Sequence, residues 1–249
     1  MSVISVFVFL SLAVGIVRGH GFISGFYIDG KYYPGFSPYF DIVGNETVLP
    51  PSRIAYSIAD NWPVYDVLSS NITCSFNPLP DPPSLVAPAR PGSDVTMIYT
   101  EWPNNHFGTI QTYMASCGTS CTSPTFNVSI APFFKIAEDG LRSDGTWASD
   151  EFLANNSTWT FKVPTDLKDG YYVVRHEMIS LHAVEKYGAE LYPQCFQIQI
   201  VGGTGTREPD GVRFPGAYAQ KDPGLTYNRT TDAGTPYVFP GPSLYNAPS

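Results

Sequence analysis

Apolar and polar residues alternate in many short segments of this chain. In residues 158–163, Trp159, Phe161 and Val163 fall on one face of an extended strand, and the polar side chains between them fall on the other. A period of two is the pattern of a strand that is buried on one face. Similar segments occur at residues 20–32, 95–100, 108–115, 132–137, 171–180 and 195–201. The chain is therefore expected to be all-β: an antiparallel immunoglobulin-like or fibronectin-like β-sandwich with long ordered loops.

Two stretches lack this alternation. Residues 33–91 are rich in proline and long for a structureless connection, so we expect ordered loops with short strands inside them. The residues after Gly203 can form either a disordered tail or a long loop packed on the sandwich. Their tyrosines favour packing, because disordered tails are usually poor in aromatic residues. Neither stretch contains a Ser/Thr/Pro linker, and residues 20–249 are expected to form a single domain.

The first 19 residues have most features of a secretory signal peptide. Residues 2–17 are an apolar run, and Val17 and Gly19 stand three and one positions before the expected cut. No Lys or Arg precedes the run, which is unusual for a signal, and the run is too short for a stable membrane span. We expect a secreted, extracellular protein without a membrane segment, whose mature chain begins at His20.

A histidine at the amino terminus can chelate a metal ion. Its α-amine and its ring Nδ1 both titrate near neutrality, so both can be free bases at ordinary pH. Such nitrogen donors suit Cu(II) better than calcium or magnesium. The alternative is a cut one or two residues away, which makes His20 an ordinary surface histidine. Position alone favours that alternative, and the rest of the chain favours the metal ligand.

The four cysteines support secretion. Cys74, Cys117, Cys121 and Cys195 allow three pairings of two disulfides. Cys117 and Cys121 can bridge across a tight turn, which would leave Cys74 to pair with Cys195. The alternative, a zinc knuckle, requires ligand spacings that this chain lacks.

Charge and sequons limit the partners further. The formal net charge is −8 and no cluster of Lys and Arg is present, so nucleic acid is not an expected partner. Acceptor sequences for N-glycosylation, which a secreted chain should carry on its surface, occur at Asn45, Asn71, Asn127, Asn155, Asn156 and Asn228.

Three further histidines differ in their surroundings. His106 lies in a turn-like segment just before an expected strand, which suits a ligand at a sheet end. His176 stands inside a strand between Arg175 and Glu177, where a structural hydrogen bond is the better interpretation. His182 ends the same segment, and Tyr192 follows after a short loop.

Taken together, these segments resemble the fungal lytic polysaccharide monooxygenases of auxiliary activity family nine, once classed as glycoside hydrolases. The resemblance covers the whole mature chain. The segments that carry it are His20–Phe22, Ile28–Gly30, Phe133–Ile136, Trp147–Asp150, Tyr172–His182, Gly188–Cys195, Phe214–Tyr218 and Pro240–Pro242. We expect residues 20–249 to be a single copper-dependent catalytic domain without a separate carbohydrate-binding module.

The resemblance implies a copper site and its chemistry. Three nitrogens would hold one copper ion that cycles between Cu(II) and Cu(I): the amine and ring of His20 and the ring of His106. Tyr192 would take the axial position, and His182 would stand beside the oxygen-binding position. The family cleaves β-1,4-glucans, mainly cellulose, at C1 or C4, using O₂ or H₂O₂ and an external reductant or electron-donor protein. Exposed tyrosines dock the polymer, for which Tyr227 and Tyr237 are candidates, and a monomer is expected.

Three positions depart from the family pattern. The family usually has Gly-Pro-Val after the second histidine, where this chain has Phe107–Ile110, and the loop between His182 and Tyr192 is one residue shorter than is common. Glu190 stands where the family usually has Gln. An ionised carboxylate can only accept hydrogen bonds, so we expect Glu190 to accept from Tyr192 or His182, to favour Cu(II) and to influence catalysis. The alternative is a Glu190 that faces solvent and has no influence.

Two other functions remain open at this stage. One is a copper-binding protein of the same fold with little polysaccharide cleavage, which the change at Glu190 favours. The other is a hydrolase with Glu177 and Asp150 as paired carboxylates. A carboxylate next to Arg175 within a strand is more typical of a structural ion pair than of such an acid/base pair.

Overall fold

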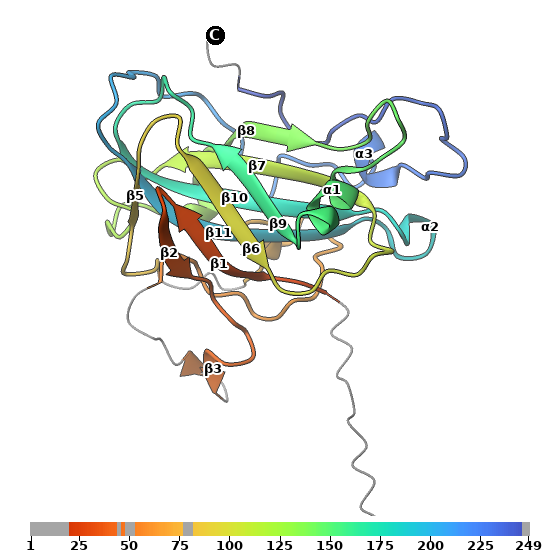
Figure 1. The fold of residues 1–249 in the computed structure, drawn as a ribbon, viewed down its shortest axis with the longest axis horizontal. Coiled ribbons are helices and arrows are strands. Elements are labelled where there is room, and N and C mark those ends of the chain that lie inside the picture. Colours follow the sequence, from red (N-terminus) through yellow and green to blue (C-terminus); the bar gives the residue numbers. More distant parts are fainter. Residues whose placement is uncertain (1–19, 44–45, 48–52, 77–81, 246–249) are drawn as a thin grey trace, which may run out of the picture.

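A computed structural model describes residues 20–43, 46–47, 53–76 and 82–245. The expected signal peptide, residues 1–19, and the sequon at Asn45 lie outside the described residues. Two sheets face each other in the described part, joined by long loops (Figure 1). The predicted all-β sandwich is confirmed.

The first sheet has four antiparallel strands in the order β2–β1–β6–β9. Their bounds are Ile23–Ile28 for β1, Lys31–Pro34 for β2, Asp94–Tyr99 for β6 and Thr158–Lys162 for β9. Asp29 and Gly30 link β1 to β2, and both have positive φ, at 49° and 76°. Such a two-residue turn matches the twist of the strands that it joins.

The second sheet has five strands in the order β5–β11–β10–β7–β8. Their bounds are Ala87–Ala89 for β5, Gly108–Ser116 for β7, Phe134–Asp139 for β8, Gly170–Ser180 for β10 and Glu190–Ile200 for β11. Only β5 pairs in parallel, with β11. The three central strands are buried on both faces, so this sheet has a covering layer outside the sandwich as well as a partner inside it.

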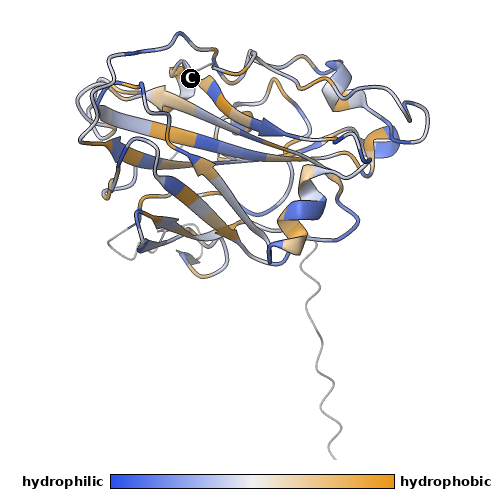
Figure 2. Ribbon diagram, turned by 45° about the horizontal axis from the view of Figure 1, so that its top comes forward, coloured by the Kyte–Doolittle hydropathy of each residue, from blue (hydrophilic) through white to orange (hydrophobic). Residues whose placement is uncertain are grey.

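The inner core lies between the two sheets. Figure 2 shows apolar and polar positions alternating in colour along the strands. Phe161 and Val163 face this core while Thr160 and Lys162 face solvent, so the predicted faces of this segment are confirmed. The alternation is the cause of the layering, because each strand can bury its apolar side chains only on one side.

A second core lies on the outer face of the second sheet. The carboxyl-terminal segment covers it, with Phe214, Tyr218 and Leu225 buried against the strands. The stretch after Gly203 is thus packed, as its tyrosines indicated. The guanidinium of Arg175 is fully buried here, 3.8 Å from the ring centroid of Phe214.

The loops hold the short elements. These are β3 (Ile42–Val43), β4 (Glu46–Thr47), η1 (Ser70–Ile72), η2 (Val128–Ile130), α1 (Ala148–Ala154), α2 (Val184–Tyr187) and α3 (Pro223–Thr226). Disulfides join Cys74 to Cys195 and Cys117 to Cys121, which is the pairing favoured by the sequence. No helix among the described residues has the length and apolar character needed to cross a membrane.

One element begins earlier than the sequence indicated. β11 starts at Glu190, five positions before the expected strand at Cys195. Tyr192 and Gln194, which precede the expected strand, therefore lie on a strand. Because side chains alternate along it, Glu190, Tyr192 and Gln194 share one face.

Candidate metal centre

Three strand ends meet at one end of the second sheet. β7 and β11 both pair antiparallel with β10, so the starts of β7 and β11 lie beside the end of β10. Ser180, the last residue of β10, pairs with Gly108 on one side and with Glu190 on the other. His106 precedes β7 by two residues and His182 follows β10 by two. The sheet register therefore brings His106, His182 and Glu190 together.

His20 reaches the same place from the first sheet. The side-chain oxygen of Gln194 accepts a hydrogen bond from the backbone N–H of Ile23, at 2.9 Å. The Asn61 amide donates to the carbonyl oxygen of His20. These two contacts fix the start of β1 over the face of β11 that carries Tyr192, whose ring centroid lies 5.5 Å from that of His20.

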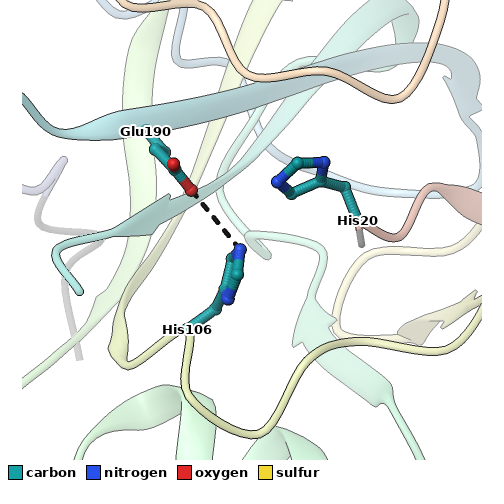
Figure 3. A group of neighbouring side chains, drawn as sticks. All are labelled: His20, His106 and Glu190. Carbon is teal, nitrogen blue, oxygen red and sulfur yellow. Dashed lines mark ion pairs between the residues drawn. The ribbon is translucent and has the colours of Figure 1, made fainter. Parts of the chain in front are cut away.

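The donor atoms converge closely enough to share one ion. The ring centroids of His20 and His106 are 5.3 Å apart, and the rings meet edge to face at 65°. Three possible ligand atoms lie within 4.8 Å of one another, one each from His20, His106 and Glu190. Figure 3 shows these three side chains approaching from separate segments of the chain.

The protonation state of His106 suits a ligand. Its Nδ1 lies 2.9 Å from the side-chain oxygen of Asn105, which fixes Nδ1–H as a donor and leaves the Nε2 lone pair available. That Nε2 is buried and has no hydrogen-bond partner. A buried nitrogen without a partner is costly in a folded protein, and a metal ion would satisfy it.

Burial keeps both histidines neutral. It lowers the pKa of His106 to about 4, with further lowering from His182 and His20 and an opposing effect of Glu190. It also lowers the pKa of His20. Both rings are therefore in the neutral form that binds metals at ordinary pH.

Glu190 lies inside the site. Its side chain is buried, with the residue 4% exposed, so the alternative of a solvent-facing carboxylate is wrong. It accepts hydrogen bonds from the hydroxyls of Tyr192 at 2.8 Å and Tyr65 at 3.0 Å. The bond from Tyr192 was predicted. Burial first, and then Glu190, raise the pKa of Tyr192, so this phenol keeps its proton.

His182 stacks on His106. Their ring centroids are 3.9 Å apart and the rings are 24° from parallel. The Nδ1 of His182 lies 2.9 Å from the hydroxyl oxygen of Ser180. His182 also lines a surface hollow with Phe107, Lys186 and Arg229, so it stands between the buried site and solvent.

The two tyrosines expected to dock a polymer do not form an exposed platform. Tyr227 is 6% exposed, and Tyr237 is half-buried. Both rings pack edge-on against Trp147, with centroids 5.6 and 5.5 Å away. The expectation of exposed tyrosines is wrong here, because these rings hold the carboxyl-terminal segment in place. Exposed aromatic side chains next to the site include Trp62, 64% exposed and 5.1 Å from the His20 ring, and Tyr65, which contacts Glu190.

The two carboxylates of the hydrolase interpretation both take part in structural contacts, and Glu177 is out of reach of a substrate. Glu177 is fully buried, 2.5 Å from the Arg175 guanidinium, and accepts from the Tyr218 hydroxyl. Asp150 accepts from the backbone N–H of Trp147 at the start of α1. Both have structural roles. His176 is buried as well, with its Nδ1 2.9 Å from the Thr112 hydroxyl oxygen, as its position in a strand indicated.

Several residues of the site were not identified from the sequence. Asn105 and Gln194 position ligands, while Tyr65 and Trp62 border the site. Asn105 adjoins His106 in sequence, so it could have been found as a candidate partner. Tyr65 and Trp62 lie in the proline-rich stretch, where no periodicity predicts which residues meet the sheet.

The glycosylation sequons differ in accessibility. Asn127, Asn155 and Asn156 are exposed, whereas Asn71 and Asn228 are half-buried. The Asn228 amide donates to the carboxylate of Glu185. Glycans at the three exposed positions remain a prediction.

Fold and site together define a class of protein: a β-sandwich whose strand ends gather histidines for a metal ion. Residues 20–237 match Auxiliary Activity family 9 (formerly GH61), and the chain belongs to this family. Members are lytic polysaccharide monooxygenases, which are copper enzymes and oxidoreductases. The Phe107–Gly108 departure and the change at Glu190 leave this membership intact.

Relatives and solved structures agree with the family match. The chain is 40% identical to AA9 family lytic polysaccharide monooxygenase B of Malbranchea cinnamomea, over 97% of this chain and 98% of that protein. It is 37% identical to monooxygenase C of Geotrichum candidum, a longer protein of which it covers 44%. The extended catalytic domain of H. jecorina LPMO9A superimposes with a TM-score of 0.81 at 33% identity, covering 92% of this chain and 94% of that one. A structure described as a cellulose-active polysaccharide monooxygenase from M. thermophila gives 0.75 at 30%, covering 91% and 99%.

Proposed function

We propose that this protein is secreted, is cut after Gly19, and oxidatively cleaves β-1,4-glucans such as cellulose at C1 and/or C4. The observation that carries the proposal is the buried, unpartnered Nε2 of His106 facing His20. The cellulose-active enzyme among the structural neighbours supports the substrate class. The single domain, residues 20–249, would act as a monomer.

The same geometry supports a proposed set of copper ligands. The amine and ring of His20 and the Nε2 of His106 would supply three nitrogens to the ion, and the phenol oxygen of Tyr192 would be a further contact. When bound, copper supplies the one-electron steps that activate O₂ or H₂O₂, with electrons from an external reductant or donor protein. The protein supplies a fixed geometry, a buried surround and the hydrogen bonds of Asn105 and Gln194.

His182 would donate or accept a proton next to the reacting oxygen. Its ring is fixed by stacking on His106 and by the contact with Ser180. A ring held on both sides can present or receive a proton in a constant direction. Insertion of one oxygen atom into a C–H bond from O₂ also forms one water and consumes two electrons and two protons, so a proton route is required.

Docking of the polymer would use the surface around Trp62. Its exposed ring adjoins His20, and sugar rings stack on aromatic faces. Replacing Trp62 with Ala should weaken binding to cellulose while the copper affinity of the protein stays unchanged. Equal retention of both proteins on cellulose would contradict this docking surface.

Mass spectrometry of the products tests the function. Copper-loaded protein given cellulose and a reductant should release aldonic-acid or C4-oxidised oligosaccharides. His106→Ala should release none, since His20 alone cannot hold the three-nitrogen site. Hydrolytic products that persist with a copper chelator would contradict the proposal. Copper binding without oxidised products from any β-1,4-glucan would favour the second candidate, a copper-binding protein with little cleavage, which the buried Glu190 carboxylate supports.

A further inference from the structure

We propose that Glu190 is a direct ligand of the metal through its Oε2 atom. The side chains of His20, His106 and Glu190 then form a three-donor site that is complete without the terminal amine. The inference rests on the proposed copper site and adds to it a ligand that the resemblance does not provide.

The first argument is the spacing of donor atoms. Oε2 of Glu190 lies 3.5 Å from Nε2 of His106, marked by the dashed line in Figure 3. This is too long for a good N–H···O hydrogen bond. Two ligands of one ion, each about 2.0–2.1 Å from it, are separated by about 2.8 Å at a right angle and about 4 Å when opposite. The observed spacing falls between these values, as it would for two atoms bound to the same ion.

The second argument is the missing cation. Glu190 is buried, and its ion-pair contacts among the described residues are with His106 and His182 only. The Nδ1–H of His106 is held by the side-chain oxygen of Asn105, so the Nε2 that lies nearest Glu190 presents a lone pair and not an N–H. No Lys or Arg of the described chain pairs with Glu190. A buried carboxylate is costly without a cation, and a divalent ion at this position would supply the charge.

The third argument is the orientation of the carboxylate. Tyr65 donates to Oε1 and Tyr192 donates to Oε2, so each oxygen has one hydrogen bond. A carboxylate has about four lone-pair sites, so Oε2 keeps capacity for a metal. Ligating carboxylates are typically hydrogen-bonded in this way by residues behind them. The two tyrosines therefore fix Glu190 as they would fix a ligand.

The donor set predicts a preference among metals and oxidation states. Two imidazoles and a carboxylate bind divalent ions such as Zn²⁺ and Cu²⁺. A hard anionic oxygen favours Cu(II) over Cu(I). The Cu(II) affinity should therefore depend on Glu190 more strongly than the Cu(I) affinity does.

A two-by-two set of proteins tests the proposal. One form starts at His20, and the other carries an additional Ala before His20, which removes the amine from the ligand position. Each is made with Glu190 and with Glu190→Gln. Cu(II) and Cu(I) dissociation constants come from competition titrations, and electron paramagnetic resonance gives the ligand field of Cu(II).

We expect the Glu190→Gln substitution to lower the Cu(II) affinity strongly in both forms. In the form that starts at His20, Glu190→Gln should weaken Cu(II) binding by about 10–100-fold and shift the spectrum. In the Ala-extended form, the Glu190 protein should still bind Cu(II) or Zn²⁺ through its side chains, and the Gln protein should not. Glu185→Gln is the matched control, because this nearby carboxylate contacts Asn228 and not the site.

Glu190→Asp separates ligation from charge. Asp keeps the negative charge but is one methylene shorter, so it should behave like Gln if Glu190 is a ligand and like Glu if only its charge matters. Circular dichroism establishes that each variant is folded. Unchanged Cu(II) affinity and spectra in Glu190→Gln, or wild-type behaviour of Glu190→Asp, would overturn the inference. A wild-type protein starting at His20 that fails to bind copper would instead overturn the proposed function.

Discussion

At the scale of single residues, the buried histidines show how one side chain serves two purposes. His106 and His176 are both buried and both have a lowered pKa. Each ring has a buried Nε2 without a hydrogen-bond partner, but that of His106 lies 3.5 Å from Glu190 in a ring that adjoins His20, whereas His176 is enclosed by β-strand neighbours and contacts Thr112. A sequence pattern can separate them, since one lies at a strand end and the other in a strand interior. It cannot show which partner fixes the tautomer of each ring.

His176 makes the stability of the protein depend on pH. Burial, with a smaller effect of Arg175, lowers its pKa from 6.5 to about 3. Between these values the unfolded state binds a proton and the folded state does not, so stability is full above pH 6.5 and falls as the pH decreases. The slope from this residue is about 1.4 kcal/mol per pH unit. Urea unfolding of metal-free His176→Gln should show a shallower loss between pH 6 and pH 4.5 than wild type does; parallel curves would contradict the assignment.

Asn105 should determine how well His106 binds copper. Its side-chain oxygen holds the Nδ1–H of that ring. Asn105→Ala should weaken Cu(II) binding by about 10–100-fold, since loss of such a partner frees the ring to rotate. Asn105→Asp retains an acceptor and should bind nearly as wild type, and Asn104→Ala controls for the loop. Competition titration measures all three, and equal affinities would show that Asn105 has no part in positioning the ring.

At the scale of elements, the site is a product of strand register. The alternation of apolar residues predicted most strands and the inward faces of the 158–163 segment. It failed at the start of β11, because Glu190 and Gln194 are polar residues on an inward face. Glu190 points at the metal centre and Gln194 accepts from the backbone N–H of Ile23, so a hydrophobic pattern does not identify either position. The positions where the pattern failed are thus the positions that build the site.

The start of β7 depends on α1. The N–H of Gly108 donates to the hydroxyl of Ser149 in a buried contact of 3.0 Å, and a Cβ at Gly108 would lie 1.8 Å from the carbonyl oxygen of Ile179. Ser149→Ala leaves the Gly108 donor unsatisfied and should cost about 1–3 kcal/mol of unfolding free energy. Because His106 stands two residues before β7, copper affinity should fall too. Chemical denaturation and copper titration check this against Ser143→Ala, an exposed serine of the preceding loop; equal stability of the two variants would refute it.

At the scale of the whole molecule, long-range packing is what the sequence revealed least. The tyrosines after Gly203 indicated a packed segment, and that segment covers the outer core. Which tyrosines face solvent was not predictable, because it depends on contacts with Trp147, eighty or more positions earlier in the chain. The same holds for Trp62 beside His20. The alternation of apolar and polar residues describes each strand separately. It contains no information on which loop packs against which surface.

The two disulfides should contribute unequally to stability. Cys74 and Cys195 are separated by 121 positions, and Cys117 and Cys121 by 4. Constraint of the unfolded chain gives about 5 kcal/mol for the long loop and about 2 kcal/mol for the short one. Urea unfolding of the double Cys→Ala variants should show this order. Similar losses from the two pairs would mean that the unfolded chain is already compact between Cys74 and Cys195.

The place where the described chain ends governs how this protein can be attached to an electrode. Tyr245 packs on Phe134 and donates to Asp166, which precedes β10 at the end far from Ser180. β10 spans 11 residues, so the metal centre lies roughly 30 Å from this anchor. Immobilisation through the carboxyl-terminal residues would leave the metal centre facing the solution and open to an insoluble polymer. Electrons from the electrode would then need a diffusing mediator to reach the metal centre, because roughly 30 Å of packed protein is too far for direct electron transfer.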